Sequence, residues 1–137
     1  MRRVGRGARY CQKGRLVRHE DQLPGFAVDV VAKGAAIVVV VAGEVDIYTA
    51  PRMAEALEQA VTHAARPLVV DLSAVKFFDS SGLNVLLRGT QATAELRVVA
   101  SPVVRRLVEV TGLTTVLRIF DRVDDAITAT GDTSDHR

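Results

Sequence analysis

The chain has 137 residues, of which 48% are hydrophobic, enough for one domain with its own core, built without Trp from Val, Leu, Ala and Ile. Its longest apolar run, residues 35–43, is about half as long as a membrane span, and a single cysteine, Cys11, excludes an internal disulfide and a thiolate metal cluster. No apolar leader with a cleavage site opens the chain, so we expect a cytoplasmic protein without membrane association.

The net charge of +2 hides an uneven distribution. Residues 1–18 carry six Arg, one Lys and no acidic residue, whereas the other 119 residues carry 11 basic and 16 acidic side chains. A nucleic-acid-binding arm is one interpretation, but the segment lacks hydrophobic periodicity and has one tyrosine for stacking. We therefore predict a disordered extension over residues 1–24 without direct DNA binding, one domain over 25–131, and a frayed tail over 132–137.

The first half of the predicted domain contains two strands and a helix. Residues 26–32 and 36–42 are predicted to be strands, and the β-branched run in the second suits a strand that is covered on both faces. Apolar residues at helical spacing predict a helix over about 50–64, with Thr49 as its N-cap.

The second half repeats strand and helix three times. Strands are predicted over residues 67–72, 95–100 and 116–120. Helices are predicted to begin near Ser80, at Pro102 after the cap Ser101, and at Asp121. The order β-β-α-β-α-β-α-β-α predicts an α/β domain, with a mixed, mainly parallel sheet of four or five strands and about four helices.

Polar side chains gather on loops after three of the predicted strands, where α/β sheets collect their functional groups. These loops span residues 43–49, 73–81 and 100–102 and carry Asp46, Thr49, Asp79, Ser80, Ser81 and Ser101. A nucleophilic serine needs a neighbouring base, but His19, His63 and His136 lie in the tails or at the far end of a helix. Neither metal-ligand spacing nor a glycine-rich phosphate loop is present. We therefore expect a protein that is not an enzyme and holds no cofactor or metal.

The segment LVVDLSAVKFFD (68–79) is similar to the strand-end aspartate segment of response-regulator receiver domains, with Asp71 as the phosphoacceptor. Such a domain needs an acidic pair after its first strand and a lysine after its last strand. FAVDVVAKG offers no acidic pair and RIFDRVD offers Arg but no Lys, so this interpretation is rejected.

Three segments resemble the STAS-domain anti-sigma factor antagonists of bacteria: GEVD (43–46), VVDLSAVKFFDSSGLNVLL (69–87) and SPVVRRLVEVTGL (101–113). The resemblance covers about residues 26–130 and implies the STAS fold. In that family the unphosphorylated protein binds an anti-sigma factor and frees the sigma factor. The anti-sigma factor is a serine kinase that phosphorylates the first serine after the aspartate, here Ser80, and a serine phosphatase resets the switch.

The resemblance also implies a partner-binding surface around Ser80, with Ser81 as the alternative phosphorylation site. The residues of this surface are Asp46, Thr49, Asp79, Ser80, Ser81, Gly82 and Leu83. From the residues themselves other roles stay open, because Asp46 and Thr49 suit a helix cap, Gly82 suits close packing and Leu83 suits the core.

Two features depart from the family pattern: Asn84 stands where glycine is frequent, and residues 88–95 form a shortened connection. We expect a monomer or weak dimer. The alternative function is a STAS interaction module in another complex, such as a stress-signalling assembly or a lipid-transport system.

Overall fold

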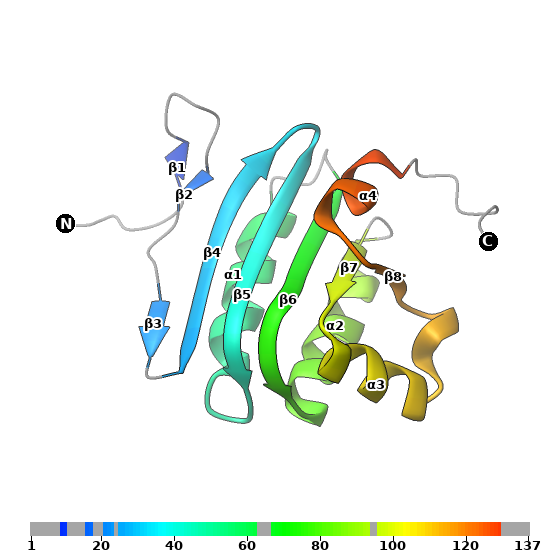
Figure 1. Cartoon of the computed structure of the whole chain (residues 1–137). Coiled ribbons are helices and arrows are strands. Elements are labelled where there is room, and N and C mark those ends of the chain that lie inside the picture. The colour runs from blue at the N-terminus through cyan, green and yellow to red at the C-terminus, as the bar shows by residue number, and fades with distance from the viewer. Residues whose placement is uncertain are drawn as a thin grey trace.

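The architecture is one main sheet with helices packed on it (Figure 1). The computed structural model describes residues 9–10, 16–17, 21–23, 25–62, 67–93 and 96–129, the first three ranges by their backbone alone. The main sheet consists of six strands, β3 (Asp21–Leu23), β4 (Phe26–Lys33), β5 (Ala36–Val45), β6 (Leu68–Phe78), β7 (Leu96–Ala100) and β8 (Arg118–Phe120). The helices are α1 (Ala50–Val61), α2 (Ser80–Ala92), α3 (Pro102–Val110), the 3-10 turn η1 (Leu113–Thr115) and α4 (Val123–Thr128). Two short strands, β1 (Arg9–Tyr10) and β2 (Leu16–Val17), pair with each other.

The sheet is mixed, as the sequence predicts. Its strands lie side by side in chain order, and β3, β4 and β5 are antiparallel neighbours whereas β5, β6, β7 and β8 are parallel. Parallel pairing requires crossover connections, and α1, α2 and α3 supply them. The predicted α/β class with four helices is therefore confirmed, and β3 is one strand more than predicted.

The main core lies between the sheet and the three crossover helices, and Figure 1 shows α1 and α2 behind the sheet. Successive side chains of a strand point to opposite faces, which explains the two-sided burial of β5. Ile37, Val39 and Val41 enter the main core, whereas Ala36 and Val38 enter a second cluster on the opposite face. The prediction that this strand is covered on both faces is confirmed.

The opposite face is partly covered by α4, which is anchored by apolar contacts and by a buried arginine. Ala126 is buried in the second cluster, and Val123 and Ile127 pack against it. Arg97 on β7 is 1% exposed, and its Nη1 donates a hydrogen bond to the carbonyl oxygen of Ala126 at 2.7 Å. A cation near the last carbonyls of a helix is favourable, so Arg97 fixes the end of α4 to the sheet.

Strand β6 is longer than predicted, and the difference bears on the candidate site. Residues 73–78, which the sequence analysis assigned to a loop, continue the strand, because Val75 and Phe78 are buried in the main core. Shifts in the β5–β6 register accommodate this stretch. Asp71 therefore lies within the strand and not at its end, and its Oδ1 accepts a hydrogen bond from the N–H of Ser73 at 3.0 Å. This position adds a structural reason against a receiver domain.

The remaining boundaries agree with the sequence to within a few residues. Helix α1 ends at Val61, near the predicted end at 64. Gly112 follows α3 with φ 76°, in the left-handed region that favours glycine, and Leu113 packs against the main core. The last helix, α4, begins at Val123, just after the predicted start at Asp121.

The N-terminal segment is described only in part. Most of residues 1–24 lies outside the described residues, as do Cys11, the three histidines and the tail over 132–137. Within this segment β3 pairs with β4, so the sheet begins at Asp21, N-terminal to the predicted domain boundary. None of the helices in the described ranges has the length and hydropathy that crossing a membrane would require.

Candidate partner-binding site

Helices α1 and α2 begin at the same edge of the sheet. They follow the carboxyl ends of β5 and β6, and parallel strands end on the same side. The N–H of Asp79 donates a hydrogen bond to the carbonyl oxygen of Val45 at 3.3 Å, which ties the start of α2 to the end of β5. The β5–α1 loop and the first turn of α2 therefore form one surface.

Asp79 begins α2, as expected for a short acidic side chain before a helix. Its Oδ1 accepts a hydrogen bond from the N–H of Ser81 at 2.8 Å, which makes Asp79 the N-cap. Ser80 is the first helical residue and is exposed, whereas Ser81 is half-buried. Since Asp79 provides the cap, the Ser80 hydroxyl is left accessible to other molecules.

The β5–α1 loop is held by a closed network between Asp46 and Thr49. Oδ1 of Asp46 accepts from the N–H groups of Tyr48 and Thr49 at 2.9 and 3.0 Å, and Oγ1 of Thr49 accepts from the N–H of Asp46 at 2.9 Å. The same hydroxyl donates to the carbonyl oxygen of Glu44 at 2.9 Å. Thr49 is 7% exposed and its side chain does not cap α1. Thr49 thus occupies the predicted N-cap position of α1 without a capping hydrogen bond, and its hydroxyl shapes the loop from inside.

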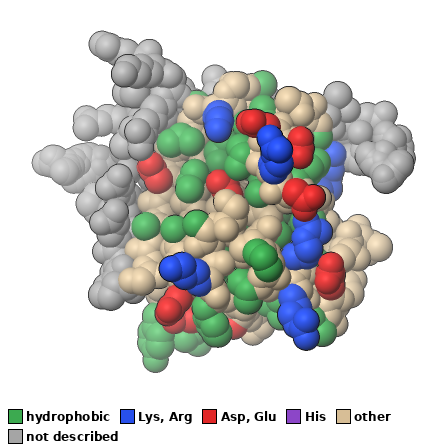
Figure 2. All heavy atoms as spheres, viewed as in Figure 1, with side chains coloured by type: hydrophobic (Ala, Val, Ile, Leu, Met, Phe, Trp, Pro, Cys, Tyr) green, Lys and Arg blue, Asp and Glu red, His purple; other side chains and the backbone are tan. Residues whose placement is uncertain are grey.

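This network displays two hydrophobic side chains that the sequence analysis missed. Ile47 is 68% exposed and Tyr48 82% exposed. Figure 2 shows hydrophobic side chains protruding at the lower edge of the molecule, where β5 and β6 end in Figure 1. The sequence does contain a signal for this exposure, because an Ile and a Tyr stand between the two polar residues of the predicted loop. Exposed apolar side chains of this size favour contact with another protein.

Two further residues of the predicted surface belong to the core. Leu83 is 6% exposed and lies in the main core. A Cβ on Gly82 would lie 2.5 Å from Cε1 of Phe78 and 2.8 Å from Cγ1 of Val45, so this glycine permits close packing. Leu83 also lines a surface hollow with Ser80 and Ser81. The place of Gly82 and Leu83 on the partner-binding surface stays a prediction. We call the exposed and half-buried residues at this edge the helix-start surface; they are Asp46, Ile47, Tyr48, Asp79, Ser80 and Ser81.

Ser101 occupies the predicted N-cap position of α3, but its side chain makes no capping hydrogen bond. It is 4% exposed, and its Oγ has no hydrogen-bond partner among the described residues. Within the same residues, no three His, Cys, Asp or Glu side chains come close enough together to hold a metal ion.

The arrangement of strands, helices and loops can be compared with known families. A family model described as "Mlab, STAS domain" matches residues 28–119, a range that begins within β4, ends within β8 and contains the helices α1, α2 and α3. The chain belongs to the STAS domain family. The matched range also contains the whole helix-start surface of this STAS domain.

Among STAS domains, the chain is similar in sequence to anti-sigma factor antagonists. The chain is 34% identical over 107 residues to the anti-sigma-F factor antagonist RsfB of Mycobacterium tuberculosis, a match that covers 75% of this chain and 88% of the relative. It is 39% identical over 84 residues to an anti-sigma-B factor antagonist of Listeria monocytogenes, covering 58% of this chain and 74% of the relative. The resemblance of this STAS domain to anti-sigma factor antagonists is therefore confirmed.

Solved structures agree with the fold of the STAS domain. An anti-sigma factor antagonist from Mycobacterium paratuberculosis is 37% identical and superimposes with a TM-score of 0.71, covering 78% of this chain and 95% of the other. The unphosphorylated form of the antagonist SpoIIAA has a TM-score of 0.57 at 22% identity, covers 74% of this chain and 93% of that one, and supports the fold alone.

Proposed function

We propose that this STAS domain is an anti-sigma factor antagonist whose binding is switched off by phosphorylation of Ser80. The observation that carries the proposal is the exposed hydroxyl of Ser80 in the first turn of α2, on the same edge as the exposed Ile47 and Tyr48. In the unmodified protein, the apolar side chains and the small hydroxyl form a surface on which a partner can pack without burying a charge beyond the Asp79 carboxylate, which already accepts the N–H of Ser81.

A phosphate on Ser80 would change this surface through its charge. The group adds roughly −1.5 to −2 charges at neutral pH, beside the Asp79 carboxylate that already occupies the N-terminus of α2. In the free protein this charge stays in water and near the positive end of the helix dipole, so the fold tolerates it. Within a complex, an uncompensated buried charge costs on the order of 3–5 kcal/mol, which corresponds to roughly two to three orders of magnitude in affinity.

The partners follow from the proposal. The protein that binds the unmodified surface is an anti-sigma factor with serine kinase activity, and a serine phosphatase restores the hydroxyl. The STAS domain contributes a surface and a phosphorylation site and carries out no reaction of its own. We propose a cytoplasmic location, where such partners act.

The experiment that tests this function uses substitutions at the two serines. Ser80→Ala should keep the fold and bind the anti-sigma factor whether or not kinase and ATP are present. Ser80→Glu should fold but bind at least about a hundredfold more weakly, since one carboxylate is placed where the partner packs. Calorimetric titration measures the affinity, and mass spectrometry after incubation with ATP locates the phosphate.

The matched control is Ser81→Ala, because Ser81 is half-buried and only its N–H takes part in the cap. This variant should still be phosphorylated on Ser80 and released. Phosphate on Ser81 alone, or undiminished binding by Ser80→Glu, would refute the switch. Recovery of transport subunits without any kinase-type anti-sigma factor, in a pull-down from the native cell, would instead support a STAS module of another complex.

A further inference from the structure

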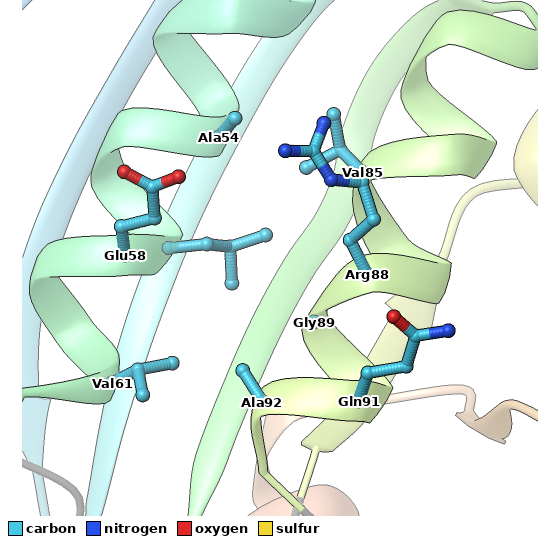
Figure 3. A pocket seen from close by; sticks show the side chains of 9 residues that line it. Ala54, Glu58, Val61, Val85, Arg88, Gly89, Gln91 and Ala92 are labelled. Atoms are coloured by element: carbon cyan, nitrogen blue, oxygen red, sulfur yellow. The ribbon is translucent and has the colours of Figure 1, made fainter.

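A groove runs between α1 and α2 on the outer side of these helices. It encloses about 400 Å³. Its lining is largely apolar and consists of Ala54, Leu57, Glu58, Val61, Val85, Arg88, Gly89, Gln91 and Ala92. Figure 3 shows the two helices as the walls of this groove, with side chains of both directed into it.

The groove is continuous with the helix-start surface. A second hollow of about 360 Å³ shares Ala54, Glu58, Val85 and Arg88 with the first. At its other end this hollow is lined by Ile47 and Ser81. A partner that packs on the helix-start surface can therefore extend along α1 and α2 without a break.

Two opposite charges face each other across the apolar floor. Glu58 projects from α1, and the guanidinium of Arg88 extends from α2 toward α1 (Figure 3). Both side chains are exposed, and no ion pair joins them in the part of the chain that the structure describes. The groove thus offers an acid on one wall and a base on the other, separated by apolar side chains.

We propose that this groove docks an amphipathic helix of the anti-sigma factor, an inference that rests on the function proposed above. The apolar stripe of the docked helix lies on the accessible apolar side chains of the groove, Ala54, Val61 and Ala92. A basic side chain of that helix lies toward Glu58 and an acidic one toward Arg88. The twelve residues of α1 extend over about 18 Å, which matches roughly three turns of a bound helix.

The charges of the groove favour this occupant over the chain's own basic segment. Residues 1–18 contain no acidic side chain and so offer nothing to Arg88. A partner helix with both a basic and an acidic side chain can pair with Glu58 and Arg88 at once. These two pairs hold the helix in one orientation. The groove therefore contributes specificity for the partner, whereas Ser80 controls whether binding occurs.

The test measures the affinity of the purified anti-sigma factor for charge-reversed variants. Glu58→Lys and Arg88→Glu should each bind at least about tenfold more weakly, because each places like charges opposite each other in the complex. Glu109→Lys and Arg106→Glu on α3 make the same charge changes at exposed positions outside the groove and should bind like the unsubstituted protein. Melting temperatures close to that of the unsubstituted protein establish that the variants are folded.

The double variant Glu58→Lys with Arg88→Glu distinguishes recognition by a partner from a pair within the domain. If the partner contacts both charges, the double variant binds more weakly than either single variant. If the double variant recovers the full affinity, or if the single variants bind normally, the groove inference is wrong while the function stands. If the unsubstituted, unphosphorylated protein does not bind the anti-sigma factor at all, both proposals fail.

Discussion

Gly82 fixes how closely the first turn of α2 approaches the sheet. The position where a Cβ would stand is already occupied by the ring of Phe78 and the side chain of Val45, at 2.5 and 2.8 Å. Both neighbours are buried in the main core, so neither has free space to move into. Ser80, two residues earlier, is thereby held at the edge of the sheet beside the β5–α1 loop.

We predict that Gly82→Ala lowers the free energy of unfolding by about 1–3 kcal/mol, since overpacking outweighs the gain of about 1 kcal/mol in helix propensity. Gly89→Ala is the matched control in the same helix, because its Cβ would meet only Cδ2 of Leu96 at 3.2 Å. Urea denaturation should show a clearly larger loss for Gly82→Ala. Equal stability of the two variants would contradict the packing argument.

Among the secondary-structure elements, helix α4 depends most clearly on its contacts with the sheet. A helix of six residues is too short to be stable alone, so contacts with the sheet must hold it. Ala126 supplies a buried apolar contact, and Arg97 supplies the hydrogen bond to the helix's carbonyl end. Because the charge of Arg97 is costly to bury, this residue serves to position α4 on the sheet as much as to stabilise it.

We predict that Arg97→Met loosens α4 while the sheet remains intact. Hydrogen exchange of the amides in residues 123–129 should become about tenfold faster or more, which equals a local loss of about 1.4 kcal/mol. Amides of β5 and β6 should keep their protection. Arg106→Met on the exposed side of α3 is the control, and unchanged exchange in α4 for Arg97→Met would show that apolar contacts alone hold the helix.

The whole molecule has one edge that depends on the N-terminal segment. β3 covers the outer side of β4 through three residue pairs, the last of them Leu23 with Phe26. Without β3, residues Phe26–Val28 of β4 would lose their pairing on this side and leave backbone groups that another chain can bind. Loss of the short β1–β2 pair should destabilise the domain much less, since two-residue strands contribute little stability.

We predict different outcomes for two N-terminal deletions. Removal of residues 1–20 should change the free energy of unfolding by less than about 0.5 kcal/mol and leave anti-sigma factor binding within tenfold. Removal of residues 1–24 should cost about 0.6–3 kcal/mol, at roughly 0.2–1 kcal/mol for each of the three lost cross-strand pairs, and favour self-association. Urea denaturation and size-exclusion chromatography measure the two effects. Equal stability of the deletions would mean that β3 does not support the sheet.

Sequence alone determined the class of fold and the start of α2. Period-two and period-3.6 patterns predict five of the main strands and all four helices, because these patterns reflect which faces must leave water. Asp79 and Ser80 were found in the same way, since capping chemistry is local and depends on neighbours along the chain.

Only the tertiary structure decided which side chains of the candidate site are exposed and which are buried. The sequence cannot tell that Thr49 and Leu83 point inward and that Ile47 and Tyr48 point outward, because this depends on how a loop closes against a distant strand. The added strand β3 and the continuation of β6 to Phe78 depend in the same way on pairing partners far along the chain. Burial and pairing are non-local, and packing against distant segments resolves the choices that short-range chemistry leaves open.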